Sequence, residues 1–193
     1  MTSRAALPDE LGRQLPQLAR EYLQAELCGL SAPEPAAELA AILAQPGACF
    51  VTLTQNNQLR GCIGSLLAHR SLGEDLRSNT YSAAFADPRF PPLTAAELDD
   101  TSVEVSVLTA PRELTVQSRA EFLAALRPEV DGVIVRFGYH QATFLPQVWQ
   151  QLSDPELFFE HLLRKAGLPS GFWDSNLQLA TYQVHAWESD AVQ

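Results

Sequence analysis

The chain has few cysteines and no long apolar run. Three cysteines stand among its 193 residues, odd in number and widely spaced: Cys28, Cys49 and Cys62. This spacing argues against a disulfide framework and against a structural zinc site, so we expect free thiols in a reducing cytoplasm and no metal or other cofactor. No apolar stretch reaches the roughly 18 residues of a membrane-spanning helix, and the first residues lack the apolar core of a signal peptide. We therefore expect a cytoplasmic protein without a membrane partner.

Basic charge is also scarce. Lysine and arginine number 13 against 23 aspartates and glutamates, which gives a net charge of −10. A nucleic-acid surface requires a basic patch or stripe, and since the sequence has none, we expect no nucleic-acid partner. Hydrophobic residues make up 46% of the chain, which indicates a globular protein with a substantial core. No internal repeat or low-complexity linker interrupts it.

Hydrophobic spacing and turn residues predict an α+β fold. Helices are expected at 9–27, 35–44, 72–86, 118–126 and 155–165. Strands are expected at 49–54, 59–65, 102–109, 133–137, 142–145 and 177–188. Pro16 falls inside the first helix and should kink or restart it. Because strands and helices do not alternate strictly, we expect a mainly antiparallel sheet with flanking helices.

The strands at 49–54 and 59–65 predict a hairpin with two possible registers. A two-residue loop at Asn56 and Asn57 would pair Leu53 with Arg60 and mix apolar with polar partners. A three-residue loop followed by a bulge would pair Leu53 with Gly61 and keep each face uniform, so we favour it. This register places four side chains together on the polar face of the hairpin: Thr52, Thr54, Arg60 and Cys62.

The second strand of this hairpin carries the strongest candidate for a site. Cys62 stands between Gly61 and Gly64 and near Arg60. Glycine weakens a strand, so two glycines indicate the close approach of another backbone or of a ligand. A guanidinium beside a thiol favours the reactive thiolate. Cys62 is therefore a candidate nucleophile, and the alternative is a small cysteine packed in a tight strand.

Other polar residues complete the candidate site. In the alternating strand at 102–109, Glu104 and Ser106 share a face and can lie near Cys62. Glu104 is then a general base or the ion-pair partner of Arg60. Arg89, which follows Asp87 and Pro88, either binds an anion or pairs with Asp87. We predict Cys62 and Glu104 as catalytic residues, and the predicted ligand-binding residues are Arg60, Gly61, Gly64, Arg89 and Ser106.

Six ordered motifs resemble the AMMECR family, also called AmmeMemoRadiSam system protein A. They are Leu59–Gly64, Ala84–Phe90, Val103–Leu108, Asp131–Val133, Phe144–Val148 and Lys165–Leu168. The resemblance implies one AMMECR-type domain over residues 1–193, with a larger and a smaller lobe that form a cleft near the glycine–cysteine motif. It also implies a radical SAM protein and a Memo-like protein as partners. Leu163 departs from the family, in which many relatives carry a cysteine, and Pro16 replaces an aliphatic residue.

Two functions fit these observations. The first is an enzyme that uses Cys62 in a cleft to act on a small metabolite or a modified protein residue. The second is a non-catalytic accessory module that presents a ligand or a protein to the radical SAM or Memo-like partner. Catalysis by an isolated thiol requires a base near it, and no histidine of the chain stands in a recognisable triad pattern, which favours the second function.

Overall fold

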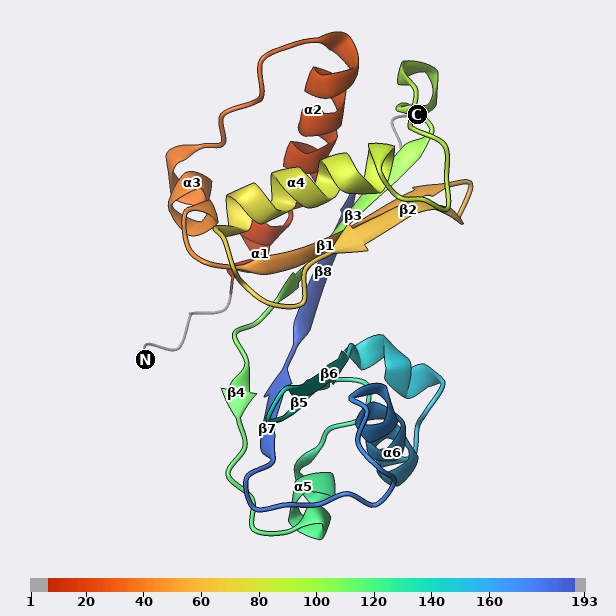
Figure 1. The fold of residues 1–193 in the computed structure, drawn as a ribbon. Coiled ribbons are helices and arrows are strands. Elements are labelled where there is room, and N and C mark those ends of the chain that lie inside the picture. The colour runs from red at the N-terminus through yellow and green to blue at the C-terminus, as the bar shows by residue number, and fades with distance from the viewer. Residues whose placement is uncertain (1–6, 190–193) are drawn as a thin grey trace. The chain divides into compact units, whose positions relative to one another are not determined.

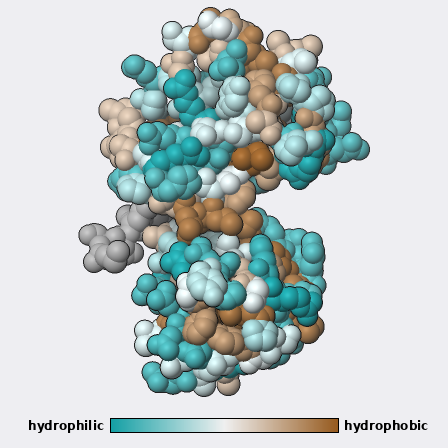
Figure 2. Space-filling view, in the orientation of Figure 1, coloured by the Kyte–Doolittle hydropathy of each residue, from teal (hydrophilic) through white to brown (hydrophobic). Residues whose placement is uncertain are grey.

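The computed structural model describes residues 7–189, and these form two units. Thr109–Val184 makes up the second unit, and the described residues before and after it make up the first. Each unit has a core and a four-stranded sheet of its own (Figure 1). In the space-filling view, polar residues are interleaved with apolar patches over both units (Figure 2). No helix within residues 7–189 is both long and apolar enough to cross a bilayer.

The sheet of the first unit has the strand order β2-β1-β3-β8. Its strands are β1 (Ala48–Gln55), β2 (Gln58–Gly64), β3 (Thr101–Leu108) and β8 (Val184–Ser189), and β1 pairs antiparallel with both β2 and β3. The helices are α1 (Asp9–Gly12), α2 (Leu15–Cys28), α3 (Ala37–Leu43) and α4 (Leu72–Phe85), followed by the 3-10 helix η1 (Ala95–Glu97). α4 packs against β1 and β2, and α2 packs against α4 and β3.

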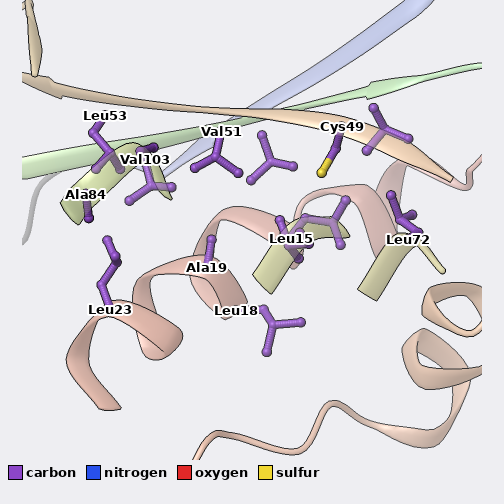
Figure 3. Close-up of a cluster of buried hydrophobic side chains, with 14 of the residues drawn as sticks. Leu15, Leu18, Ala19, Leu23, Cys49, Val51, Leu53, Leu72, Ala84 and Val103 are labelled. Atoms are coloured by element: carbon purple, nitrogen blue, oxygen red, sulfur yellow. The ribbon is translucent and has the colours of Figure 1, made fainter. Parts of the chain in front are cut away.

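Apolar side chains between the helices and one face of the sheet form the core of the first unit. Leu15, Ala19 and Leu23 of α2 face Val51 and Val103 of the strands, and all five are buried (Figure 3). Pro16 lies at the start of α2, where a missing N–H costs no helical hydrogen bond, so the chain restarts its helix there as predicted.

The hairpin has the predicted register but not the predicted loop. Leu53 lies opposite Gly61, which confirms the register. The loop, however, is a two-residue turn of Asn56 and Asn57, with φ of 49° and 59°, rather than three residues. Two consecutive left-handed asparagines match the twist of a hairpin. The bulge instead lies within β2, where Arg60 is the extra residue.

The second unit has the strand order β4-β7-β5-β6. The strands are β4 (Arg112–Glu113), β5 (Gly132–Phe137), β6 (His140–Phe144) and β7 (Gln178–Tyr182), all in antiparallel pairs. The helices are α5 (Arg119–Ala125), α6 (Pro155–Lys165) and the 3-10 helix η2 (Pro146–Gln150). In the core, the Trp149 ring stacks on Phe158 with ring centroids 3.7 Å apart, and its indole N–H donates to the Asp131 carbonyl.

The α+β class and the antiparallel strands are confirmed, but one expected strand is wrong. Residues 177–188 form two strands, β7 and β8, which belong to different sheets. The break is at Gln183, whose backbone exchanges hydrogen bonds with Thr109. Alternation continues through this point, so the local pattern held no sign of the change of sheet. The two-residue β4 was also missed, since strands this short have no period.

Candidate functional site

Four of the predicted site residues lie in two neighbouring rows across the sheet of the first unit. Thr52 of β1 lies opposite Cys62 of β2 on one side and Glu104 of β3 on the other. Residues paired in this way point to the same face. This face, turned away from α2 and α4, is called the polar face below. The next row contains Gly64, Phe50 and Ser106.

Within the first row, the Cys62 thiol and the Glu104 carboxylate lie on strands that are not neighbours. Because β1 lies between β2 and β3, Cys62 and Glu104 are two strand spacings apart, which is roughly 10 Å. The Thr52 hydroxyl donates to Cys62 Sγ at 3.5 Å, and the Ser106 hydroxyl donates to Glu104 Oε1 at 3.1 Å. Among residues 7–189, Thr52 is therefore the polar side chain that hydrogen-bonds the thiol. Sequence reasoning placed Thr52 on this face but gave it no role.

Arg60 does not lie where the sequence placed it. The bulge turns its side chain toward Glu97 of η1, which lies beside α2, and Arg60 Nε is 3.1 Å from Glu97 Oε1. The expected pair of Arg60 with Glu104 is wrong, because the extra residue reverses the alternation at that point. Arg60 is 7% exposed, and within residues 7–189 its Nη1 is buried without a hydrogen-bond partner.

Steric contacts explain why Gly61 and Gly64 are glycines. A Cβ on Gly61 would lie 2.1 Å from the Ala83 carbonyl oxygen of α4, so β2 and α4 touch through their backbones here. A Cβ on Gly64 would lie 2.2 Å from the ring of Phe50, its neighbour across the strands. Close approach was predicted at both positions. The groups that approach are protein backbone at Gly61 and an aromatic ring at Gly64.

The ion pair with Arg60 changes the acidity of Glu97. The hydrogen bond from Arg60 lowers the pKa of Glu97 from 4.5 to about 2, with partial burial opposing the shift and Thr94 adding to it. The folded carboxylate therefore binds a proton less readily than the same carboxylate in the unfolded chain. Its contribution to the free energy of unfolding is complete above about pH 4.5 and is lost as the pH falls toward 2.

The substitution Glu97→Gln is expected to flatten the acid limb of the stability curve. Urea denaturation at several pH values between about 5 and 2 should show a smaller loss of unfolding free energy in the variant than in the natural chain. Glu10→Gln is a matched control, because the Glu10 side chain is exposed and has no partner within residues 7–189. Equal slopes in all three chains would contradict this role of Glu97.

Asp87 and Arg89 close the free edge of β2 at Cys62. The Cys62 N–H donates to Asp87 Oδ2 at 3.0 Å, and Arg89 Nη2 donates to the Cys62 carbonyl at 3.1 Å. Arg89 also binds both carboxylate oxygens of Asp87, at 2.9 and 2.6 Å. These bonds hold the pKa of Asp87 well below its usual range and raise the pKa of Arg89. The turn thus replaces a neighbouring strand.

Arg89 is accordingly the cation that the structure brings to Cys62. Besides its bond to the Cys62 carbonyl, it has an electrostatic interaction with the Cys62 side chain. Of the two alternatives for Arg89, the ion pair with Asp87 is present in the structure. The Arg89 side chain remains 52% exposed, so it can still reach a bound ligand.

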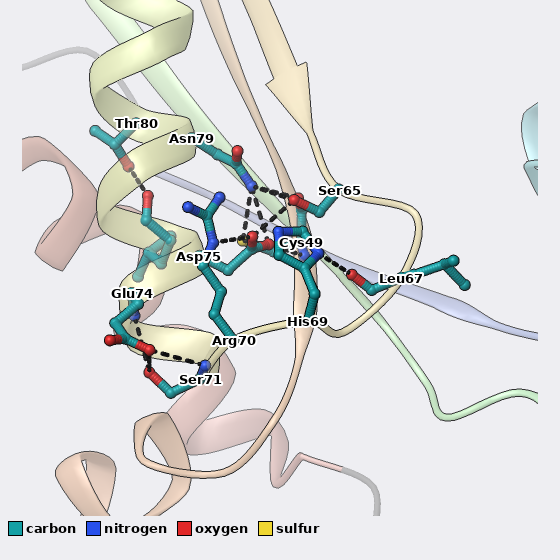
Figure 4. A network of polar contacts seen from close by, with 11 residues as sticks. Cys49, Ser65, Leu67, His69, Arg70, Ser71, Glu74, Asp75, Asn79 and Thr80 are labelled. Atoms are coloured by element: carbon teal, nitrogen blue, oxygen red, sulfur yellow. Dashed lines mark hydrogen bonds and ion pairs between the residues drawn. The ribbon is translucent and has the colours of Figure 1, made fainter.

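Sequence reasoning missed a buried polar cluster around Asp75 of α4 (Figure 4). Asp75 is fully buried and accepts hydrogen bonds from the backbone N–H of Cys49 and from the side chains of Asn79, Ser65 and Arg70. Asp75 and Asn79 are four residues apart, so they lie on the same face of the helix. Two polar residues at this spacing, on the side of α4 that carries Leu72 and Leu76, are the signal that was available.

The same cluster contains Cys49. Burial raises the pKa of the Cys49 thiol, and the nearby Asp75 carboxylate raises it further. Cys49 is therefore a protonated, enclosed thiol, in contrast to the partly exposed Cys62. Within residues 7–189, no three histidine, cysteine, aspartate or glutamate side chains are grouped as a metal site would require.

The comparison with known proteins decides the family. A model of the AMMECR1 family matches residues 16–187. The chain belongs to the AMMECR1 family. An AMMECR1-type archaeal protein from Methanothermobacter thermautotrophicus is 38% identical over 96% of this chain and 98% of its own length. One from Nanoarchaeum equitans is 35% identical over 91% of this chain and 99% of its own.

A solved structure shares the fold of this AMMECR1 protein. It is the crystal structure of the uncharacterized protein PH0010 from Pyrococcus horikoshii. The two chains are 32% identical, with a TM-score of 0.74, and the match covers 94% of this chain and 93% of the other. The six motifs of the sequence analysis therefore identified the family and the fold class correctly.

Proposed function

We propose that this AMMECR1 protein is an enzyme that uses Cys62, on the polar face, to act on a small metabolite or a modified protein residue. The observation that carries the proposal is the environment of this one thiol. Thr52 donates to its sulfur, while Asp87 and Arg89 hold its backbone at the strand edge. A hydroxyl donor and a nearby guanidinium both stabilise a thiolate, which is the nucleophilic form of cysteine.

The other predicted residues take roles that follow from their places. Glu104 is too far from Cys62 to deprotonate the thiol directly. Its role is instead that of a general base toward a substrate that extends from Cys62 along the row. Ser106 orients Glu104 by its hydrogen bond. In the next row, Gly64 has no side chain and so leaves room for the ring of Phe50. Arg89 binds a polar group of the substrate at the edge. Arg60 and Gly61 support the strand from the helix side.

The second candidate is an accessory module that presents a ligand to a radical SAM or Memo-like partner. The observation that favours it is the lack of a base in contact with the Cys62 thiol among the described residues. It predicts a stable complex with the partner and no turnover by the protein alone. For either candidate we propose a cytoplasmic location, and the net charge of −10 supports the absence of a nucleic-acid partner.

The first experiment measures the alkylation rate of Cys62 against pH by peptide mass spectrometry. We expect Cys62 to react with iodoacetamide in the folded protein across the pH range measured, as exposed Cys28 does. Buried Cys49 serves as the unreactive control. If Cys62 reacts no faster than Cys49, the thiol is a packing residue and the accessory module becomes the better proposal.

A substitution separates reactivity from packing. Cys62→Ser is expected to abolish turnover of any substrate found by screening while the unfolding free energy changes by less than about 1 kcal/mol. The half-buried site tolerates a hydroxyl, and Thr52 can donate to it as it does to the sulfur. Thr52→Val is the companion variant, and it should lower the alkylation rate without removing the thiol. A large loss of stability in Cys62→Ser would argue for packing.

A further inference from the structure

The second unit contains a groove lined by the segment that follows β4 and the segment that precedes β7. β4 pairs with β7, and the Leu114 N–H donates to the Leu179 carbonyl at 2.8 Å. After Leu114, no backbone hydrogen bond joins the two segments within the described part of the chain. They diverge and line an open groove with a volume of about 680 Å³. Sites for small organic ligands have volumes of this order.

The groove offers negative charge and an aromatic ring. Glu113, Asp174 and Trp173 line it, and its lining contains no lysine, arginine or histidine. Within residues 7–189, the Glu113 side chain makes no hydrogen bond and no ion pair. Asp174 accepts two hydrogen bonds from Asn176 at a single oxygen, Oδ1, so its Oδ2 remains available. The two carboxylates that line the groove therefore have no cationic partner among the described residues.

Trp173 is held in place by the core of the unit. The indole is partly buried, and its ring centroid lies 6.5 Å from that of Phe122, which is fully buried. Val116 and Leu177, also part of the lining, add apolar surface near it. A fixed indole attracts a cation to its face, and the attraction is larger for tryptophan than for the other aromatic residues.

We propose that this groove binds an organic cation, a protonated amine or guanidinium on an apolar stem. The carboxylates of Glu113 and Asp174 would bind the charged group, and Trp173 with its apolar neighbours would pack against the stem. The cation can belong to a free small molecule or to a lysine or arginine side chain of a peptide. The inference is independent of Cys62 and of the function proposed for it.

Calorimetric titration of the full chain tests the inference. The probes are agmatine, which is a free cation, N-acetyl-arginine amide, which carries the same group as a peptide does, and N-acetyl-citrulline amide, its neutral counterpart. We expect saturable binding of at least one arginine-type probe and binding of the citrulline compound that is weaker by about tenfold or more. Tighter binding of agmatine supports a free ligand, and tighter binding of the capped arginine supports a peptide side chain.

Two variants locate the binding. Glu113→Gln is expected to weaken binding of the better probe by about tenfold. Glu129→Gln is the matched control, since Glu129 is exposed in the same unit and does not line the groove, and it should leave the affinity unchanged. Cys62→Ser should also leave it unchanged. The inference is overturned if neither cationic probe binds saturably, if citrulline binds equally well, or if Glu113→Gln has no effect.

Discussion

Replacing Asp75 with asparagine is expected to lower the free energy of unfolding of the first unit by about 3–5 kcal/mol. The carboxylate receives hydrogen bonds from five donors on four residues, which are Cys49, Ser65, Arg70 and Asn79. Asparagine has the same size, but it carries an NH₂ group in place of one carboxylate oxygen. This NH₂ group would face N–H or O–H donors, from which it cannot accept a hydrogen bond. The negative charge opposite Arg70 is lost as well, and the Arg70 guanidinium, whose side chain is 30% exposed, loses its ion-pair partner.

The effect should be confined to the ends of β1 and β2 and to α4. Urea denaturation measures the total loss, and hydrogen exchange followed by mass spectrometry assigns it to these elements. Asp100→Asn is the control, because Asp100 is exposed and its side chain has no partner within residues 7–189. A loss below about 1 kcal/mol in Asp75→Asn would show that the cluster does not stabilise the unit.

Gly61→Ala is expected to destabilise the same unit by about 3 kcal/mol. The new Cβ would lie 2.1 Å from the Ala83 carbonyl oxygen, which belongs to the backbone of α4 and cannot rotate away. Either β2 or α4 must shift, and both carry apolar core residues on that side. Because Cys62 follows directly, the shift should also disturb the hydrogen bonds that the Cys62 backbone donates to Asp87 and accepts from Arg89.

The control for this variant is Gly73→Ala in α4. There the nearest atom to a new Cβ is Leu43 Cβ at 3.2 Å, a small overlap, and alanine favours the helix by about 1 kcal/mol over glycine. The two substitutions are chemically identical and differ in the space available. Denaturation should rank the chains with Gly61→Ala far below Gly73→Ala. Similar stabilities would mean that the contact between β2 and α4 relaxes without cost.

Most of the fold was predictable because its signals are local. The capping residues Ser71, Ser118 and Asp154 precede α4, α5 and α6, and each side chain accepts from the third residue after it. The apolar alternation of β3 is confirmed by the burial of Val103, Val105 and Val107. These features depend on neighbours within a few residues. The family also followed from ordered motifs in the sequence.

The candidate site was predictable in part. Alternation correctly placed Cys62 and Thr52 on one face of the hairpin, and Glu104 and Ser106 on one face of β3. It did not reveal that β1 lies between the two strands, which separates the thiol from the carboxylate. The partner of Arg60 was also missed, because Glu97 is 37 residues away in sequence. The cleft of the family resemblance and the roles of the site residues stay predictions.

The sequence by itself determined which side chains share a face, where helices begin, and to which family the chain belongs. These are properties of backbone period, capping chemistry and motif order, and each acts over a short stretch of chain. Only the tertiary structure decided the strand order, the bulge at Arg60, the change of sheet at Gln183 and the cluster around Asp75. Each of these depends on which distant segments pack together, because a buried donor or charge takes whichever partner the packing brings to it.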